Sequence, residues 1–244
     1  MANRYYIDQR VRLSSEGPTQ VTLRGSEAHH LIHVMRVKTG AHVVLFDGSG
    51  AEFSSRVGRV GRSDVELTVL QRNVIDRELP RRVALAVSLP KGDRQRWLVE
   101  KAVELGVAEV IPLATSRSVA QPVQQALDRL RRAVIEASKQ CGRNRLMAIA
   151  EPVAWSDFIE ATRNEPQRLL AHPPSVSPPG TRHRHDGFPE PAGRIVVAVG
   201  PEGGLATEEV ALATEAHWRL VALGPRILRT ETAALVMVAL ANAR

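Results

Sequence analysis

Two stretches near the end of the chain decide the fold: residues 200–204, Gly-Pro-Glu-Gly-Gly, and residues 223–233, Leu-Gly-Pro-Arg-Ile-Leu-Arg-Thr-Glu-Thr-Ala. Each follows a short apolar run, 195–199 or 220–223, that predicts a buried parallel strand, and each precedes a helical pattern. Open α/β sheets bind nucleotide-like ligands at the carboxyl ends of neighbouring parallel strands. Glycine lets a ligand approach the backbone, and the next helix directs free N–H groups toward the loop. The two stretches therefore predict a ligand site in an α/β domain.

The region before these stretches alternates between strands and helices. We expect strands at 83–89, 109–113, 146–150 and 168–171, and helices at 94–105, 123–141 and 155–163. This order predicts a mostly parallel sheet covered by helices. Residues 77–82, Arg-Glu-Leu-Pro-Arg-Arg, are predicted to be a linker.

The N-terminal residues have a different pattern, that of short strands separated by turns. Strands are expected at 20–23, 42–46, 52–60 and 64–70. One helix interrupts them, capped by Ser26, with Ala28, Leu31, Ile32 and Met35 on its apolar face. Five or six short strands with one helix predict a small β-barrel. We therefore expect two domains, residues 1–76 and 77–244.

Composition limits the class of protein. The chain has 244 residues, of which 43% are hydrophobic, so it can bury a sizeable core. No apolar run approaches the roughly 20 residues that cross a bilayer. The first residues lack the apolar core of a signal peptide, and the single cysteine, Cys141, cannot form an internal disulfide. A cytoplasmic protein is expected.

The chain is strongly basic, with a formal charge of +7 and a pI of about 10.4. This charge is typical of nucleic-acid-binding proteins, although genome composition can also produce an arginine bias. Much of the excess positive charge lies in residues 117–145, which contain seven basic and two acidic residues. The predicted helix 123–141 has its apolar stripe at Val123, Leu127, Leu130, Val134, Ala137 and Cys141. Its arginines lie off that stripe, on a face that is either solvated or in contact with RNA.

Two further segments have clear patterns. The last helix, predicted at 232–243, is apolar nearly all round, so it is buried either in its own fold or in a subunit interface. Residues 173–193 hold six prolines and are predicted to be a surface loop. The sequence His183-Arg184-His185-Asp186 in that loop could ligate a metal, but a polar loop without a metal is the favoured interpretation.

Known catalytic and phosphate-binding motifs are missing from the sequence. There is no G-x-x-x-x-G-K-[ST], no G-x-G-x-x-G after the first strand, and no HExxH, CxxC or GxSxG. What remains is a backbone-lined pocket for an uncharged or zwitterionic adenosine derivative. Arg226, Arg229, Glu202 and Glu231 are expected close to it.

The two glycine stretches resemble those of the RsmE family, SPOUT-superfamily methyltransferases that act on N3 of a uridine in 16S ribosomal RNA. Other stretches resemble family positions as well, namely residues 34–37, 46–50, 91–93, 100–107 and 140–145. The resemblance covers nearly the whole chain, and the run LGPRILRTETA is its most specific part.

The resemblance implies a trefoil-knotted α/β domain with helices on both faces of a parallel sheet, preceded by a PUA-like RNA-binding domain. It also implies a homodimer and S-adenosylmethionine (SAM) as cofactor, with no metal. Carried over residue by residue, the cofactor pocket would be formed by Leu170, His172, Gly200, Glu202, Gly203, Leu223, Gly224, Ile227, Leu228, Thr232 and Ala233.

Chemistry narrows the catalytic candidates. Uridine N3 carries a proton at neutral pH, so a base must remove it or a cation must stabilise the resulting anion. Glu231 or Glu202 is the candidate base, and Arg229 the candidate stabiliser. The alternative is structural: Glu202 fixes its loop, and Glu231 pairs with Arg226 or Arg229.

Arginines are the candidate contacts to 16S rRNA, which is expected as a partner within the small ribosomal subunit. They are Arg10, Arg12, Arg24 and Arg36 in the first domain and Arg129, Arg132 and Arg143 in the second. His29, His30 and His33 are expected to pack the N-terminal helix rather than to catalyse. Two other functions stay open: a non-catalytic RNA-binding or ribosome-assembly protein, and a SPOUT methyltransferase for another RNA.

Overall fold

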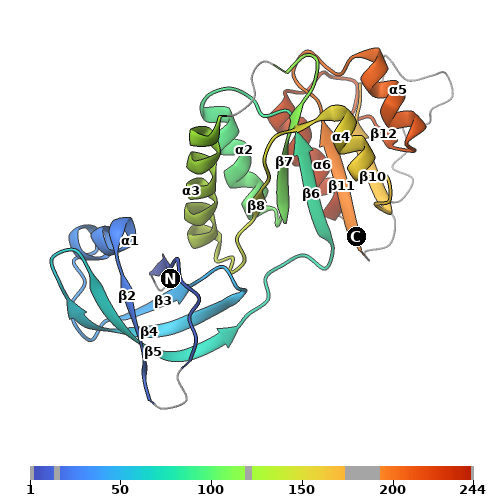
Figure 1. The fold of residues 1–244 in the computed structure, drawn as a ribbon. Coiled ribbons are helices and arrows are strands. Elements are labelled where there is room, and N and C mark those ends of the chain that lie inside the picture. Colours follow the sequence, from blue (N-terminus) through green and yellow to red (C-terminus); the bar gives the residue numbers. More distant parts are fainter. Residues whose placement is uncertain (1–2, 14–16, 119–122, 174–192, 243–244) are drawn as a thin grey trace. The chain divides into compact units, whose positions relative to one another are not determined.

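The computed structural model describes residues 3–13, 17–118, 123–173 and 193–242 (Figure 1). Its contacts divide the chain into two compact units. The first is Met1–Glu78 together with Ser138–Leu146, and the second is Leu79–Ala137 together with Met147–Arg244. A single boundary between residues 76 and 77 stays a prediction, and the contacts add segment 138–146 to the N-terminal residues. Residues 174–192, which hold most of the proline-rich stretch and its His183-Arg184-His185-Asp186 sequence, lie outside the described residues.

The first unit is built on a five-stranded sheet with the order β1-β3-β4-β5-β2. Its strands are β1 (Arg4–Tyr6), β2 (Thr19–Leu23), β3 (His42–Phe46), β4 (Ala51–Val60) and β5 (Val65–Val74). Strands β1 and β3 pair in parallel and the other neighbours are antiparallel. The register of β4 against β5 shifts at Ser54/Ser55 and at Val57/Arg59, and such bulges bend a strand and increase its twist. The small β domain that the sequence predicts is present.

The N-terminal helix differs in detail from the prediction. Helix α1 (Gly25–His29) runs directly into a π-helix, η1 (His30–Val34). It begins before Ser26, and its N-cap, Arg24, makes no side-chain capping bond, so Ser26 is not the cap. The N–H of Met35 bonds to the carbonyl of His30, five residues back. That wide turn breaks the 3.6-residue period, and Met35 is exposed although Leu31 is fully buried.

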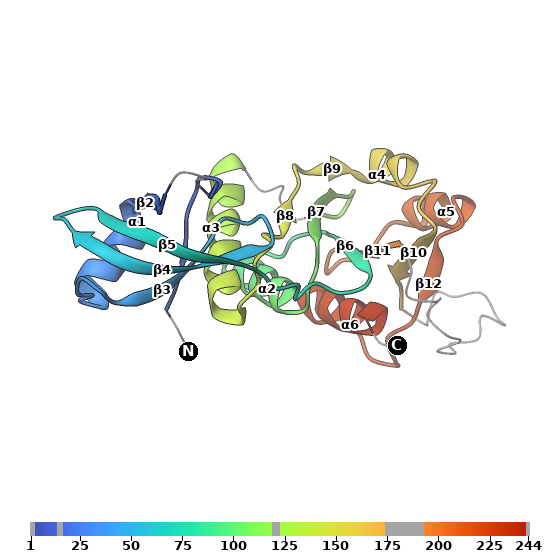
Figure 2. The same ribbon diagram turned by 90° about the horizontal axis from the view of Figure 1, so that it is seen from below.

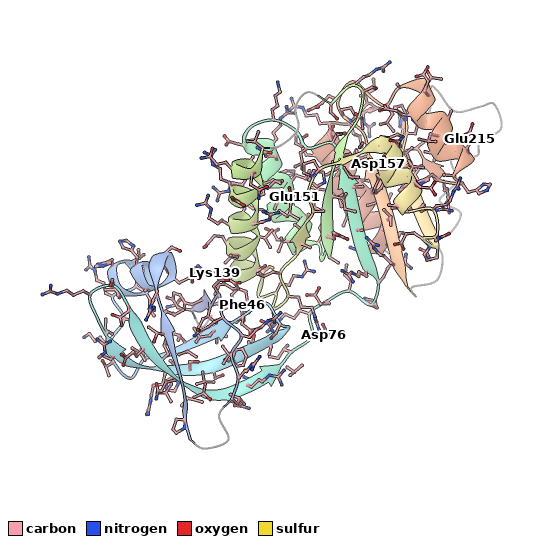
Figure 3. All side chains as sticks on the ribbon, in the orientation of Figure 1. Phe46, Asp76, Lys139, Glu151, Asp157 and Glu215 are labelled. Atoms are coloured by element: carbon pink, nitrogen blue, oxygen red, sulfur yellow. The ribbon has the colours of Figure 1, made fainter. Side chains whose placement is uncertain are left out.

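The segment 138–146 is held in the first unit by charged side chains. Lys139 donates to Glu27 over 2.8 Å, and Arg143 pairs with Glu78 over 2.5 Å. Arg4 donates to both Glu52 and Asn144. Phe46, labelled with Lys139 in Figure 3, is fully buried in the same unit. These contacts explain why a segment distant in sequence belongs to the N-terminal unit.

The second unit is an α/β layer structure. Its sheet has the order β12-β10-β11-β6-β7-β8, with β9 also pairing β7, and every pairing is parallel. The strands are β6 (Arg82–Val87), β7 (Glu109–Ala114), β8 (Ala148–Ile149), β9 (Val153–Ala154), β10 (Gln167–Ala171), β11 (Arg194–Val199) and β12 (Arg219–Val221). The helices are α2 (Asp93–Glu104), α3 (Gln124–Cys141), α4 (Trp155–Ala161), α5 (Thr207–Glu215) and α6 (Thr230–Asn242).

Helices cover both faces of this sheet. Helices α4 and α5 lie on one face and α2 and α6 on the other, as the two views show (Figures 1 and 2). Successive strand residues point to opposite faces. Ala84 and Val196 accordingly belong to the core under α4 and α5, while α6 packs against β6, β10 and β11 from the other side. The predicted α/β fold with a parallel sheet is confirmed. The knotted path of the chain stays a prediction.

The apolar stripe of α3 is shorter than the sequence predicts. Leu127, Leu130 and Val134 are buried as expected. Val123 precedes the helix and is exposed, and Cys141 at the helix end is only half-buried. The pattern identifies the middle of the helix correctly, because only complete turns place side chains at four-three spacing against the core.

Candidate functional site

Three strand ends meet at one edge of the parallel sheet. Strands β12, β10 and β11 are neighbours, so His172, the loop 200–204 and the segment after β12 follow adjacent strands. The N–H of His172 donates to the carbonyl of Val221 over 3.0 Å. The hydroxyl of Thr230, at the start of α6, donates to the carbonyl of Gly200 over 3.3 Å. The two glycine stretches that the sequence singled out therefore lie side by side.

The loop 200–204 is fixed from the side of β7. Arg117 donates to the carbonyl of Gly203 over 3.0 Å. The two carboxylate oxygens of Glu209 accept the N–H groups of Ala206 and Ser116, each over 2.8 Å. Gly204 closes the turn with φ +69°, a left-handed conformation that favours glycine. The loop itself is thus held through the backbone carbonyls of Gly203 and Gly200, and Glu209 fixes the segment that follows it.

One arginine connects the acidic residues of the two stretches. Arg94, in the first turn of α2, lies with Nη1 3.1 Å from Oε1 of Glu202 and 3.7 Å from Oε1 of Glu231. The side chain of Glu231 is 8% exposed and that of Glu202 is 37% exposed. Within the described residues, the ion-pair partner of Glu231 is Arg94, where the sequence alternative had named Arg226 or Arg229.

A pocket of about 590 Å³ opens at this point. It is lined by Ser88, Leu89, Lys91, Arg94, Pro201, Glu202 and Arg229. Its size lies in the range of small-molecule sites. Lys91 and Arg229 form no ion pair with a described residue, so the pocket presents two uncompensated positive charges beside the Arg94–Glu202 pair.

His172 is the titratable group at the end of β10. Burial lowers the pKa of its imidazole from the usual 6.5, because burial penalises the charged form. Its Nε2 atom is buried and has no hydrogen-bond partner among the described residues. The neutral imidazole therefore keeps one ring nitrogen without a partner among the described residues.

The other residues of the expected cofactor pocket differ in exposure. Leu170 is fully buried at the end of β10, and Ala233 is buried in the first turn of α6. Leu223 and Leu228 are half-buried, Gly224 and Thr232 are exposed, and Ile227 is 90% exposed. The segment before α6 thus presents an apolar side chain to the outside of its unit.

The arginines expected to contact RNA fall into two groups. Arg10, Arg12, Arg24, Arg36, Arg129 and Arg132 are exposed. Arg143 is 4% exposed, and its guanidinium is occupied by Glu78. Because a buried, paired arginine cannot reach a phosphate without breaking that pair, we remove Arg143 from the set of RNA contacts.

The three histidines of the N-terminal helix are all exposed. His30 packs its ring against Tyr5, and His29 against His33.

Sequence reasoning missed Arg94, Lys91 and Arg117. Lys91, Gly92 and Asp93 form one of the stretches that resemble the family, but the resemblance gives them no role. A signal was available, since this basic stretch follows β6 as the glycine loop follows β11, and β6 and β11 are neighbours. Parallel neighbours bring their carboxyl ends together, so both loops reach one pocket.

Comparison with known proteins identifies the family. Residues 77–242 match the family model described as RNA methyltransferase domain, and residues 23–70 match the RNA methyltransferase PUA domain. The chain is 31% identical to ribosomal RNA small subunit methyltransferase E of Bacillus subtilis, over 95% of this chain and 93% of the relative. This chain belongs to the ribosomal RNA small subunit methyltransferase E family. The Synechocystis member is 33% identical, over 91% of this chain and 73% of the relative.

Solved structures agree with the family. A member from Neisseria gonorrhoeae bound to S-adenosyl methionine has a TM-score of 0.85 and 30% identity, and the match covers 98% of this chain and 96% of that one. A Legionella pneumophila structure with the bound cofactor SAM has a TM-score of 0.87 and 28% identity, over 99% and 97% of the two chains. The PUA-like and SPOUT-type architecture predicted for the two parts of the chain is therefore confirmed.

The described residues contain no group of three or more His, Cys, Asp or Glu placed to hold a metal ion. Glu151, for example, lies between β8 and β9, Asp157 on α4 and Glu215 at the end of α5 (Figure 3). No described helix is long and apolar enough to cross a membrane.

Proposed function

We propose that this protein transfers a methyl group from SAM to N3 of a uridine in 16S rRNA of the small ribosomal subunit. The observation that carries the proposal is the meeting of both glycine stretches at a pocket with two uncompensated cations, Lys91 and Arg229. Its family membership supports the reaction, and the two structural neighbours with bound SAM support the cofactor. The choice of N3 rests on the resemblance to the RsmE family.

The residues at the strand ends fit SAM. A Cβ atom at Gly203 would meet only Arg117, at 3.7 Å, so the protein itself leaves room there for a ligand. His172, at the end of the neighbouring strand β10, has a ring nitrogen without a hydrogen-bond partner among the described residues. When bound, SAM supplies a methyl group that its sulfonium already activates.

The protein must therefore act on the nucleophile. Of the two candidate carboxylates, Glu202 lines the pocket and is partly exposed, whereas Glu231 is buried. We assign to Glu202 the removal of the N3 proton, within reach of an incoming uracil. Arg229 and Lys91 hold the negative charge that then spreads over O2 and O4. Glu231 acts on the pocket only through Arg94.

A homodimer belongs to the proposal. Helix α6 buries Ala233, Ala234, Met237, Val238 and Ala241 in its own unit, while Leu235, Val236 and Leu240 are only half-buried. A second copy covering this apolar side would remove those side chains from water. Light scattering coupled to size exclusion should give twice the mass of one chain, and a monomer would contradict this part.

The test of function is a transfer assay. Labelled SAM and small ribosomal subunits that lack the modification are incubated with the protein, and digested 16S rRNA is analysed by mass spectrometry. We expect 3-methyluridine at one position. In Arg229→Ala, kcat should fall roughly 100-fold, as when one charge-stabilising donor is removed.

The control variant is Arg96→Ala, because Arg96 is exposed and pairs with Glu100 on the surface of α2. It should keep full activity. Label on another RNA or another atom would contradict the substrate, and binding of SAM without any transfer would contradict the activity. Normal kcat in Arg229→Ala would exclude the role given to that residue.

A further inference from the structure

The side chain of Arg94 connects three segments that lie far apart in the sequence. It stands in the first turn of α2, Glu202 lies in the glycine loop after β11, and Glu231 lies in the first turn of α6. Both carboxylates face the same nitrogen, Nη1. The other guanidinium nitrogens of Arg94 make no ion pair with a described residue, and the side chain lines the pocket. Arg94 is therefore both an internal connection and part of the pocket wall.

Glu231 has an unsatisfied atom at this connection. Its Oε2 is buried and has no hydrogen-bond partner among the described residues. A buried carboxylate with one oxygen unsatisfied depends strongly on its counter-charge, here Arg94 at 3.7 Å. The buried Glu231 thus holds Arg94 in place, and Arg94 in turn holds the exposed Glu202 over the shorter distance of 3.1 Å.

We propose that Arg94 is a positioning residue, which sets the orientation of Glu202 in the pocket and is itself held by Glu231. This inference rests on the proposed function, since it assigns a role to residues around the carboxylate that acts there. Arginine suits the role because its donors are fixed in a rigid planar group, whereas the ammonium of lysine sits at the end of a flexible stem.

The consequence is a specific kinetic pattern. Glu202 stays in the pocket when Arg94 is removed, but its carboxylate loses its fixed direction. Misplacement by about 1 Å can cost roughly 100-fold in rate. We therefore expect Arg94→Met to lower kcat by roughly that factor and to leave the Kd of SAM within a factor of about two, because the cofactor loop is also held by Arg117 and Thr230.

The experiment compares four proteins in the transfer assay: wild type, Arg94→Met, Arg94→Lys and the double variant Arg94→Met/Glu231→Gln. The double variant matters because Arg94→Met alone leaves the buried charge of Glu231 uncompensated and could unfold the protein. It should be folded, and its kcat should be as low as that of Arg94→Met, since both changes break the same connection. Arg94→Lys should recover part of kcat, and Arg96→Ala should match wild type.

The outcomes separate the two proposals. An inactive wild type would contradict the proposed function, whereas an active wild type tests the inference. Normal kcat in the folded double variant would overturn the inference. Loss of SAM affinity in parallel with kcat in all Arg94 variants would also overturn it, because that result would make Arg94 a support of the cofactor loop.

Discussion

His172 keeps its imidazole neutral to a lower pH than a histidine in water, because burial lowers its pKa from the usual 6.5. Between pH 6.5 and the lowered pKa, the imidazole is protonated in the unfolded chain but stays neutral in the folded protein. The contribution of His172 to stability is therefore complete above pH 6.5 and is lost as the pH falls toward the lowered pKa. Acidification through this window should destabilise the wild type.

The variant that checks this is His172→Gln, which keeps a polar side chain but does not titrate. We expect the free energy of unfolding to fall less between about pH 7.5 and pH 5.5 in the variant than in wild type. Denaturant unfolding followed at several pH values measures the difference. Parallel pH curves for the two proteins would show that His172 titrates alike in both states.

For single residues, the sequence predicted some members of the site but not the side chains with which they form ion pairs. Glu202 and Glu231 are recognisable because they stand in glycine-bearing stretches after apolar runs. Arg94 is not, because an ion pair between distant segments follows from how strands are ordered in the sheet. Arg143 shows the opposite error, since a basic cluster in the sequence does not distinguish an exposed arginine from one buried against Glu78.

At the scale of elements, the roles of the glycines in loop 200–204 can be tested separately, because Gly203 and Gly204 differ in backbone conformation. Gly204 has φ +69°, so Gly204→Ala should cost about 1 kcal/mol or more of stability through backbone strain alone. Gly203 needs no such conformation, and a Cβ atom there would meet Arg117 only at an ordinary contact distance of 3.7 Å. Gly203→Ala should therefore fold as stably as wild type.

The ligand distinguishes these two variants further. If a cofactor approaches the backbone at Gly203, the added methyl group should weaken SAM binding by roughly tenfold, a loss of about 1.4 kcal/mol. Thermal unfolding and calorimetric titration with SAM measure both properties. Unchanged affinity in a stable Gly203→Ala would remove Gly203 from the cofactor site.

Strands and helices with a full pattern were predictable, and the shortest ones were not. The strand β3 and the helix α2 occur within one residue of their expected bounds, because residues 43–46 are a continuous apolar run and α2 repeats its helical pattern over 12 residues. The three-residue β1 and the two-residue β9 are too short to show any. The π-helix η1 escaped for another reason: its wider turn departs from the period on which helix prediction rests.

For the whole molecule, the composition of the two units was the least predictable feature. A linker signal marks residues 77–82, but nothing in the local sequence shows that residues 138–146 belong with the N-terminal sheet. The ion pairs Lys139–Glu27 and Arg143–Glu78 hold that segment in the N-terminal unit, and each joins charges that are far apart in the chain. Local pattern reports local structure, whereas such pairs depend on the assembled fold.

The net charge of +7 gives the last prediction, which concerns RNA binding by the whole chain. An arginine that contacts a phosphate releases a counterion, so it contributes to the fall of affinity with salt. Arg24 and Arg129 are exposed and form no ion pair with a described residue. We expect Arg24→Ala and Arg129→Ala each to reduce the slope of log K against log salt by about one, when small subunits or 16S rRNA are titrated at several salt concentrations.

Arg96→Ala should leave the slope unchanged, because Glu100 already neutralises that side chain. A steep wild-type slope that neither Arg24→Ala nor Arg129→Ala reduces would place the phosphate contacts on other residues, and a flat one would mean that charge does not drive binding.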